Sequence, residues 1–157
     1  MTTSVAVVHE ELHRLLEERV WRTLEALVTL DGEQARRHFR LFAEVLDAHM
    51  TVEDQLVIPA WRPLAPVEGP GRVDHLEGDH IVLVRLVAEI AGFLPAPADL
   101  RTTLRRLPSL YRLLGVLEHH TMREATVYRT LEGALPSDVR ERLTGLLVGL
   151  VDRLSDG

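Results

Sequence analysis

Two segments of the sequence place a histidine four residues before a glutamate: His49 with Glu53, and His120 with Glu124. On a helix this spacing puts the two side chains on nearly the same face, one turn apart. Imidazole nitrogens and carboxylate oxygens, in a chain without cysteine, are ligands that suit iron, manganese or zinc. Two carboxylates that can be shared between ions, together with several histidines, favour a site for two metal ions.

Further histidines lie on helical patterns of Leu and Val, with His13 before the first pair and His80 between the pairs. Antiparallel helices bring residues equidistant from their shared turn to the same depth. With Asp31 as the first turn, His13 lies 18 residues before it and His49 lies 18 residues after it. His80 lies 14 residues before Leu94, and His120 lies 13 residues after Leu107, the two residues taken as helix ends at the later connection. These distances support one shared layer of histidines.

A single histidine in a helix is most often a core or surface residue that hydrogen-bonds to a neighbour. The set as a whole does not fit that interpretation, because a buried carboxylate without a partner costs several kcal/mol. The chain has no lysine, and no arginine occupies the apolar faces that carry these residues. A metal cation is the partner that would neutralise the carboxylates. The candidate metal ligands are His13, His49, Glu53, His80, His120 and Glu124.

The elements that position these residues are helices, because apolar residues recur every three or four positions and almost nowhere alternate in twos. The pattern predicts an all-α fold, an up-down antiparallel four-helix bundle with an additional C-terminal helix. We expect one domain over residues 1–157, with the core bundle at about 5–133. The expected helices span about 4–30, 33–58, 72–94, 108–132 and 137–154.

Glycines and prolines set the expected helix ends. Asp31-Gly32 supply the stop of the first helix and the turn after it. Pro95 and Pro97 end the third helix, and Pro108 is expected at the first position of the fourth. The segment just before Pro108 is compatible with a short helical turn of its own. The additional C-terminal helix is expected to pack outside the bundle or between chains, which leaves a homodimer open.

Composition excludes several classes of protein and site. A formal net charge of −6 argues against binding nucleic acid or an anionic membrane. The absence of cysteine excludes disulfides, thiolate metal sites, iron–sulfur clusters and a cysteine nucleophile. No apolar run approaches the length of about 20 residues that a membrane-spanning helix needs, and the N-terminus lacks the pattern of a secretory signal. We therefore expect a soluble, cytoplasmic protein.

The histidine and glutamate motifs occur in a distinctive order. Residues 46–54 (LDAHMTVED) and 117–124 (LEHHTMRE) carry the two pairs, with Asp79-His80 between them and residues 12–16 (LHRLL) before them. Together these segments, over roughly residues 5–133, resemble the hemerythrin-like, or HHE cation-binding, domain family. His-x-x-x-Glu alone is a weak signal, but two copies in this arrangement are a strong one.

The resemblance implies a cofactor of two non-heme iron ions, for which manganese or zinc would be alternatives. It implies that Glu53 and Glu124 bridge the ions, and that the terminal ligands are His13, His49, His80 and His120. Members of the family bind dioxygen, nitric oxide or peroxide, sense oxygen or iron, or help to repair iron–sulfur clusters. A small diatomic or peroxide ligand is therefore the expected partner.

The expected third helix departs from the family pattern. The resemblance implies that oxygen-carrying members have a five-histidine site, with two of the histidines one turn apart in this helix. In this sequence Leu76, and not a histidine, stands one turn before His80. His75 lies about 140° away around a straight helix, so it is a poor ligand unless Gly78 loosens the helix. Four histidines would leave more positions open, which favours sensing or turnover of peroxide or nitric oxide over reversible oxygen carriage. An interaction module that binds zinc or no metal is a third alternative.

Other polar residues near the apolar faces have more than one interpretation. His9 lies one turn before His13 and could replace it or add a ligand, although the equal distance of His13 and His49 from the turn favours His13. Tyr128, one turn after Glu124, could hydrogen-bond to that carboxylate or be an ordinary core residue. His38 lies about 16 Å along its helix from the nearest candidate ligand, too far to share a metal. Trp21 and Trp61 are expected to be packing residues. His119 and Asp54 are expected at the surface or beside the ligands.

Overall fold

The computed structural model describes residues 3–94 and 99–156, and every regular element in that part of the chain is helical. The long helices in chain order are α1 (Val5–Val28), α2 (Gly32–Val52), α4 (Val73–Phe93), α5 (Leu100–Ala134) and α6 (Ser137–Asp156). A π-helical turn, η1 (Glu53–Val57), and the short α3 (Ile58–Trp61) continue from the end of α2. The all-α prediction is confirmed.

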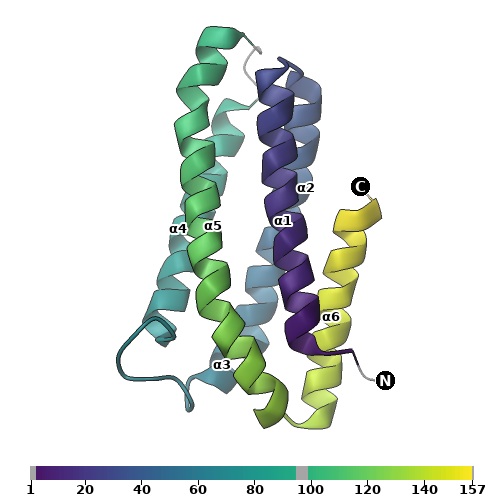
Figure 1. The fold of residues 1–157 in the computed structure, drawn as a ribbon, viewed down its shortest axis with the longest axis vertical. Coiled ribbons are helices and arrows are strands. Elements are labelled where there is room, and N and C mark those ends of the chain that lie inside the picture. Colours follow the sequence, from purple (N-terminus) through teal and green to yellow (C-terminus); the bar gives the residue numbers. More distant parts are fainter. Residues whose placement is uncertain (1–2, 95–98, 157) are drawn as a thin grey trace.

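Four of these helices, α1, α2, α4 and α5, form the bundle (Figure 1). Each runs antiparallel to the next in chain order, and contacts join α1 with α2, α2 with α4, α4 with α5 and α5 with α1. These contacts close a ring, so each helix has two neighbours and presents one face to a common interior. The predicted up-down four-helix bundle is therefore confirmed.

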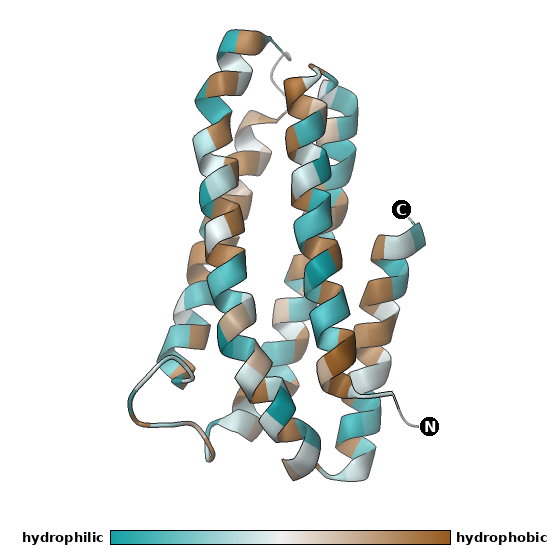
Figure 2. Ribbon diagram, in the orientation of Figure 1, coloured by the Kyte–Doolittle hydropathy of each residue, from teal (hydrophilic) through white to brown (hydrophobic). Residues whose placement is uncertain are grey.

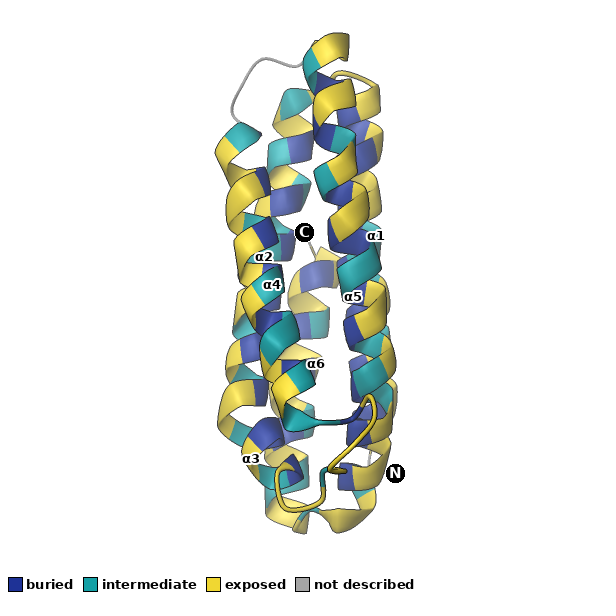
Figure 3. Cartoon of the chain, turned by 90° about the vertical axis from the view of Figure 1, so that its left-hand side faces the viewer, coloured by how far each residue is buried: buried dark blue, intermediate teal, exposed yellow. Residues whose placement is uncertain are grey.

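The interior of the bundle is lined by apolar side chains at spacings of three and four residues. Figure 2 shows apolar and polar residues alternating around each helix, and Figure 3 shows buried residues along the inward faces. α1, for example, buries Leu12, Leu16, Val20 and Leu24 along one face. Burying each such side chain contributes about 1.5–3 kcal/mol. The helices are therefore held together mainly by these apolar faces.

The turn between α1 and α2 differs from the prediction in the residue that adopts the left-handed conformation. Leu30 takes it, with φ 61°, while Gly32 is already the first residue of α2. The backbone N–H of Leu30 donates to the carbonyl of Leu27 at 3.1 Å. The N–H of Asp31 donates to the carbonyl of Ala26 at 2.8 Å, which completes a Schellman motif. The Asp31 side chain also caps α2.

The helix predicted over 33–58 changes its winding at Glu53, so a single regular helix there is wrong. The backbone N–H of Ile58 donates to the carbonyl of Glu53, five residues back rather than four. Pro59 explains this change, because it has no N–H to donate and its ring collides with the carbonyl four residues before it. The wider π turn accommodates the ring, and such turns often occur at functional sites.

The fourth bundle helix is longer than predicted. A start at Pro108 is wrong, because α5 begins eight residues earlier and contains Pro108 in its interior. The side chain of Asp99 caps α5. Pro108 leaves the carbonyl of Leu104 without its helical donor, but Leu104 is exposed, so water can solvate that carbonyl. α4 ends at Phe93 with Leu94 as its C-cap, in agreement with the end expected at about residue 94, while Pro95 and Pro97 lie outside the described residues.

α6 packs along α1 and α2, outside the ring of four helices (Figure 1). Its buried face consists of Leu143, Leu147, Leu150 and Leu154. The guanidinium of Arg19, itself buried, donates to the backbone carbonyl of Leu154. This places a positive charge at the C-terminal end of α6, where the helix dipole favours it. The apolar face of the predicted additional helix is thus covered by the chain itself.

The two tryptophans occupy different environments. Trp61 is buried, and its indole N–H donates to the carbonyl of Gly71 at 2.7 Å, which anchors the long connection between α3 and α4. Trp21 is half exposed and meets Tyr111 edge-on, with ring centroids 6.3 Å apart. In the described part of the chain, no helix is both long enough and apolar enough to span a membrane.

Candidate metal centre

Histidine and glutamate side chains from all four bundle helices and from η1 meet inside the bundle. α1 and α5 supply two each, and α2, η1 and α4 supply one each. No member of this cluster is more than 7 % exposed. The cluster consists of His9, His13, His49, Glu53, His80, His120 and Glu124. The structure therefore brings together the six candidates taken from the sequence and adds His9, which joins His13 instead of replacing it.

Three of the histidines, His9, His13 and His49, form what we call the three-histidine half. Nε2 of His9 and Nε2 of His13 each lie 3.1 Å from Oε2 of Glu124. Nε2 of His49 lies 2.9 Å from Nε2 of His13 and 3.9 Å from the same glutamate oxygen. Three imidazole nitrogens thus surround one carboxylate oxygen.

The other two histidines, His80 and His120, form the two-histidine half. Nε2 of His80 lies 3.2 Å from Oε2 of Glu53. Nε2 of His120 lies 2.8 Å from Oε1 of Glu124 and 3.9 Å from Oε2 of Glu53. One donor atom from each of these four residues lies within 4.8 Å of every other, close enough to hold one ion.

Both glutamates face both halves of the cluster. Glu124 directs Oε2 to the three-histidine half and Oε1 to the two-histidine half. Glu53 does the same, since its Oε1 lies 3.4 Å from Nε2 of His49 and its Oε2 lies 3.2 Å from Nε2 of His80. The residues therefore form two adjacent candidate metal sites: Glu124 belongs to both, and Glu53 belongs to the two-histidine half and contacts His49 of the other half.

The charges of the metal-free cluster depend on one another. Burial opposes ionisation of Glu124, but His120 lowers the pKa of Glu124 well below its usual 4.5. Burial likewise disfavours the cation of His120, but the carboxylates of Glu124, Asp79 and Glu53 raise the pKa of His120 to about 10. Burial lowers the pKa of His13 well below its usual 6.5, which keeps this ring in the neutral form that binds metals. In the metal-free protein a proton on His120 therefore balances charge that a metal ion would otherwise balance.

The ring nitrogens fit a metal site better than a hydrogen-bonded core. Among the described residues, Nδ1 of His9, Nδ1 of His49 and both nitrogens of His120 have no hydrogen-bond partner, although all three rings are buried. The 2.8 Å contact from Nε2 of His120 to Glu124 lacks hydrogen-bond geometry. A buried polar atom left unpaired costs about 1–3 kcal/mol. A metal ion bound to Nε2 of His120 would remove that cost, and these donors suit iron, manganese or zinc.

Two of the rings have a polar contact at Nδ1. Oγ1 of Thr121 lies 2.7 Å from Nδ1 of His13, and Oδ1 of Asp54 lies 3.0 Å from Nδ1 of His80. An acceptor at Nδ1 fixes the orientation of the ring and leaves Nε2 free for a metal. The Asp54 side chain is 58 % exposed, in line with the expectation of a solvated acid beside the ligands.

Tyr128 contacts Glu53, whereas the sequence suggests Glu124 as its partner. Its hydroxyl donates to Oε1 of Glu53 at 3.0 Å, and its ring stacks on His9 with the centroids 3.9 Å apart. Burial raises the pKa of Tyr128 well above its usual 10, so the hydroxyl keeps its proton. Tyr128 therefore orients one shared carboxylate and supports one histidine of the cluster.

The remaining histidines lie outside the cluster. His75 does not join it, and α4 is a regular helix through Gly78, so no local unwinding brings this ring inward. Nδ1 of His38 lies 3.2 Å from the guanidinium of Arg19. His119 is exposed and lines a cleft between α4 and α5. These positions agree with the packing and surface roles expected from the sequence.

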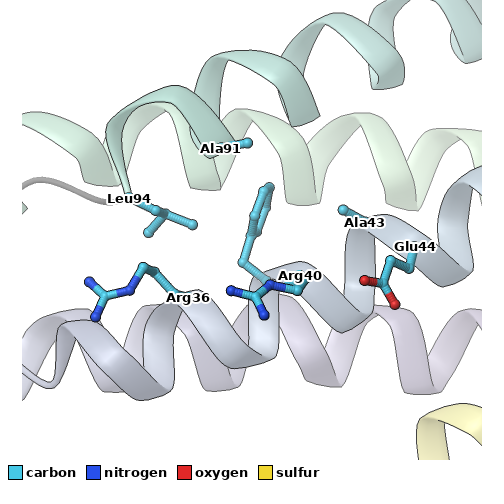
Figure 4. Close-up of a pocket in the computed structure, with 7 residues that line it drawn as sticks. Arg36, Arg40, Ala43, Glu44, Ala91 and Leu94 are labelled. Atoms are coloured by element: carbon cyan, nitrogen blue, oxygen red, sulfur yellow. The ribbon is translucent and has the colours of Figure 1, made fainter.

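An apolar groove of about 240 Å³ lies between α2 and α4 (Figure 4). It is lined by Arg36, Phe39, Arg40, Ala43, Glu44, Ala91 and Leu94. None of the seven cluster residues lines this groove, so it is separate from the candidate metal centre.

Comparison with known families agrees with the bundle and with the cluster inside it. The hemerythrin HHE cation-binding domain matches residues 2–131, which includes all seven cluster residues. The corresponding searches of curated proteins and of solved structures give no match. The match covers most of the chain and agrees with the resemblance carried by the two His-x-x-x-Glu segments. The chain therefore belongs to the hemerythrin HHE cation-binding domain family.

Proposed function

We propose that the chain binds two non-heme iron ions in this cluster and uses them to bind dioxygen, nitric oxide or peroxide. The observation that carries the proposal is that Glu53 and Glu124 each direct one oxygen to either half of the cluster. Each carboxylate would bridge the two ions. The terminal ligands would be His9, His13 and His49 on one ion, and His80 and His120 on the other.

The two halves offer different numbers of ligands. Each half faces one oxygen of Glu53 and one oxygen of Glu124, but the two-histidine half has one imidazole fewer. That half is therefore where a small ligand would bind. Bound iron supplies the redox chemistry, while the protein holds the ions, leaves a position open and surrounds the site with apolar side chains.

The fifth histidine changes one argument made from the sequence. A four-histidine set would favour reaction or sensing over reversible binding, but His9 lies with the other four. Ligand number therefore gives no preference between binding and turnover. Rapid and repeated consumption of peroxide or nitric oxide by the iron-loaded protein would make it an enzyme, whereas a stable spectral change without turnover would make it a carrier or sensor.

Metal analysis of purified protein tests the proposal. We expect close to two irons per chain, together with an optical spectrum that changes when anaerobically prepared protein is exposed to air. His120→Ala should lose iron, while His38→Ala, which removes a histidine outside the cluster, should retain it. Less than one metal per chain, or a metal content that His120→Ala leaves unchanged, would overturn the proposal. Two zinc ions in place of iron would retain the site and overturn the oxygen chemistry, because zinc does not change its oxidation state. Two manganese ions would retain the site and overturn iron as the metal.

A homodimer through α6 is a separate prediction about partners. The main leucines of α6 are buried by α1 and α2, so a second copy would have to contact Leu146 or Val148, which flank the buried stripe on opposite sides and are 41 % and 36 % exposed. Sedimentation over a range of concentrations tests this, with Leu146→Glu expected to shift a dimer to monomer.

A further inference from the structure

Behind His120, on the side away from the glutamates, lies an ion pair between α4 and α5. Oδ2 of Asp79 lies 3.5 Å from Nδ1 of His120. A guanidinium nitrogen of Arg123 donates to both oxygens of Asp79, at 2.5 Å each. The side chains of His120, Asp79 and Arg123 are 0 %, 14 % and 29 % exposed. The three residues thus form a line from the cluster to the surface.

No other histidine of the cluster has a comparable partner among the described residues. Nδ1 of His120, like Nδ1 of His9 and of His49, makes no hydrogen bond, but of these three only Nδ1 of His120 has a carboxylate within 4.0 Å, and Nδ1 of His13 contacts a neutral hydroxyl. His80 does contact the carboxylate of Asp54, but that side chain is mostly exposed, so water screens its charge. The carboxylate behind His120 is the one that is itself largely buried.

Arg123 is more accessible than Asp79. Both side chains line the cleft between α4 and α5, together with Val82, Val116 and His119. Solvent in this cleft reaches the guanidinium more readily than the carboxylate, because the exposed fraction of Arg123 is twice that of Asp79. The negative charge next to His120 is therefore only partly offset by the positive charge beyond it.

We infer that Asp79 is a positioning residue that strengthens His120 as a metal ligand, and that Arg123 limits this effect. The inference rests on the proposed function, since it concerns how the same centre holds its metal. A carboxylate at Nδ1 fixes the ring and raises the basicity of Nε2, and residues in this role are worth about 10–100-fold in metal affinity. A cation bound to that carboxylate acts in the opposite direction.

Substituting the two residues should therefore shift the centre in opposite directions. Asp79→Asn keeps the size of the side chain but removes the charge beside Nδ1 of His120, so iron affinity should fall about 10–100-fold. The more oxidised ion loses more stabilisation than the reduced one, so the reduction potential should rise, by about 59 mV for each tenfold difference. Arg123→Met leaves the charge of Asp79 uncompensated, so the potential should fall and iron should bind at least as tightly.

The experiment is a potentiometric titration and an iron-binding measurement on the full chain and its variants. Asp152→Asn and Arg153→Met, two exposed positions on α6, make the same charge changes away from the cluster and should match the unchanged protein. Opposite shifts for Asp79→Asn and Arg123→Met support the inference, because simple structural damage would weaken both variants alike.

The failure of the inference is distinguishable from failure of the proposed function. If the unchanged protein holds two irons but both variants lose affinity together, or neither differs from its α6 control, the inference alone is overturned. If the unchanged protein holds no iron, the proposed function is overturned and the inference with it. Should Asp79→Asn fail to fold, the direction of the change in reduction potential in Arg123→Met still tests the inference. A lower potential supports it, and an unchanged or higher potential overturns it.

Discussion

Glu124 is the side chain on which both halves of the cluster converge. It is 3 % exposed, and its two oxygens contact His9 and His13 on one side and His120 on the other. The chain contains no lysine that could pair with it. A proton on His120 neutralises it in the metal-free protein, and a metal ion would do so in the loaded protein.

Glu124→Gln should lower the metal content from two ions per chain to one or fewer. The amide keeps the size of the side chain but removes the charge that both sites share. Glu118→Gln, an exposed position on the same helix, is the matched control and should retain two ions. Metal analysis after exhaustive dialysis measures the difference. A Glu124→Gln protein with an unchanged metal content would show that this carboxylate is not shared.

The metal-free protein should lose stability between about pH 6.5 and pH 10. Although burial opposes it, the neighbouring carboxylates raise the pKa of His120 to about 10, against about 6.5 in the unfolded chain. The folded state then holds a proton that the unfolded state has released. This stabilisation is fully present below about pH 6.5 and is lost as the pH rises through about 10.

Denaturant unfolding of the metal-free unchanged protein and of His120→Gln across this range measures the effect. The difference in the free energy of unfolding between the two should shrink as the pH rises. His119→Gln, which changes an exposed neighbour, should follow the unchanged protein at every pH. A difference that stays constant with pH would mean that His120 is not protonated in the fold.

At the scale of the helices, the repeating apolar pattern predicts which segments are helical and which face is buried, whereas single prolines predict the local helix geometry poorly. His49 and Glu53 could be assigned because they fall on an apolar face with a spacing of one turn. The effects of Pro59 and Pro108 could not be predicted in this way. Pro59 widens a turn, and Pro108 is tolerated inside α5, where the residue four positions before it, Leu104, is exposed. The sequence leaves open whether His9 adds a ligand, because counting residues from the turn selects one depth in each helix, whereas α1 supplies two histidines from successive turns.

The turn after α1 gives a prediction about stability. Leu30 holds a left-handed conformation that costs a non-glycine residue about 1–3 kcal/mol, and its side chain is 44 % exposed. Leu30→Gly should therefore stabilise the protein, by about 1 kcal/mol once the greater entropy of the unfolded glycine is included. Leu104→Gly, at an exposed position inside α5, should instead destabilise it by about 1 kcal/mol. Urea unfolding distinguishes the two signs, and a destabilised Leu30→Gly would contradict the strain argument.

For the whole molecule, removal of the metal should lower the unfolding temperature. An ion that binds only the folded state adds about 2.7 kcal/mol when its free concentration is 100 times its Kd. Treatment with a chelator should therefore shift the melting curve of the loaded protein downward, and adding iron back should restore it. His120→Ala should show a smaller shift or none. A melting temperature that chelation does not change would favour an interaction module without a structural metal.

The origin of the cluster residues has a consequence for how the bundle opens. They come from every bundle helix, and contacting residues such as His9 and Glu124 stand 115 positions apart in the chain. In a protein without cysteine, bound ions would serve as its cross-links and close long loops that the free chain leaves open. No bundle helix could then detach alone without breaking coordination, and the most protected backbone amides in all four helices would report one common free energy of opening.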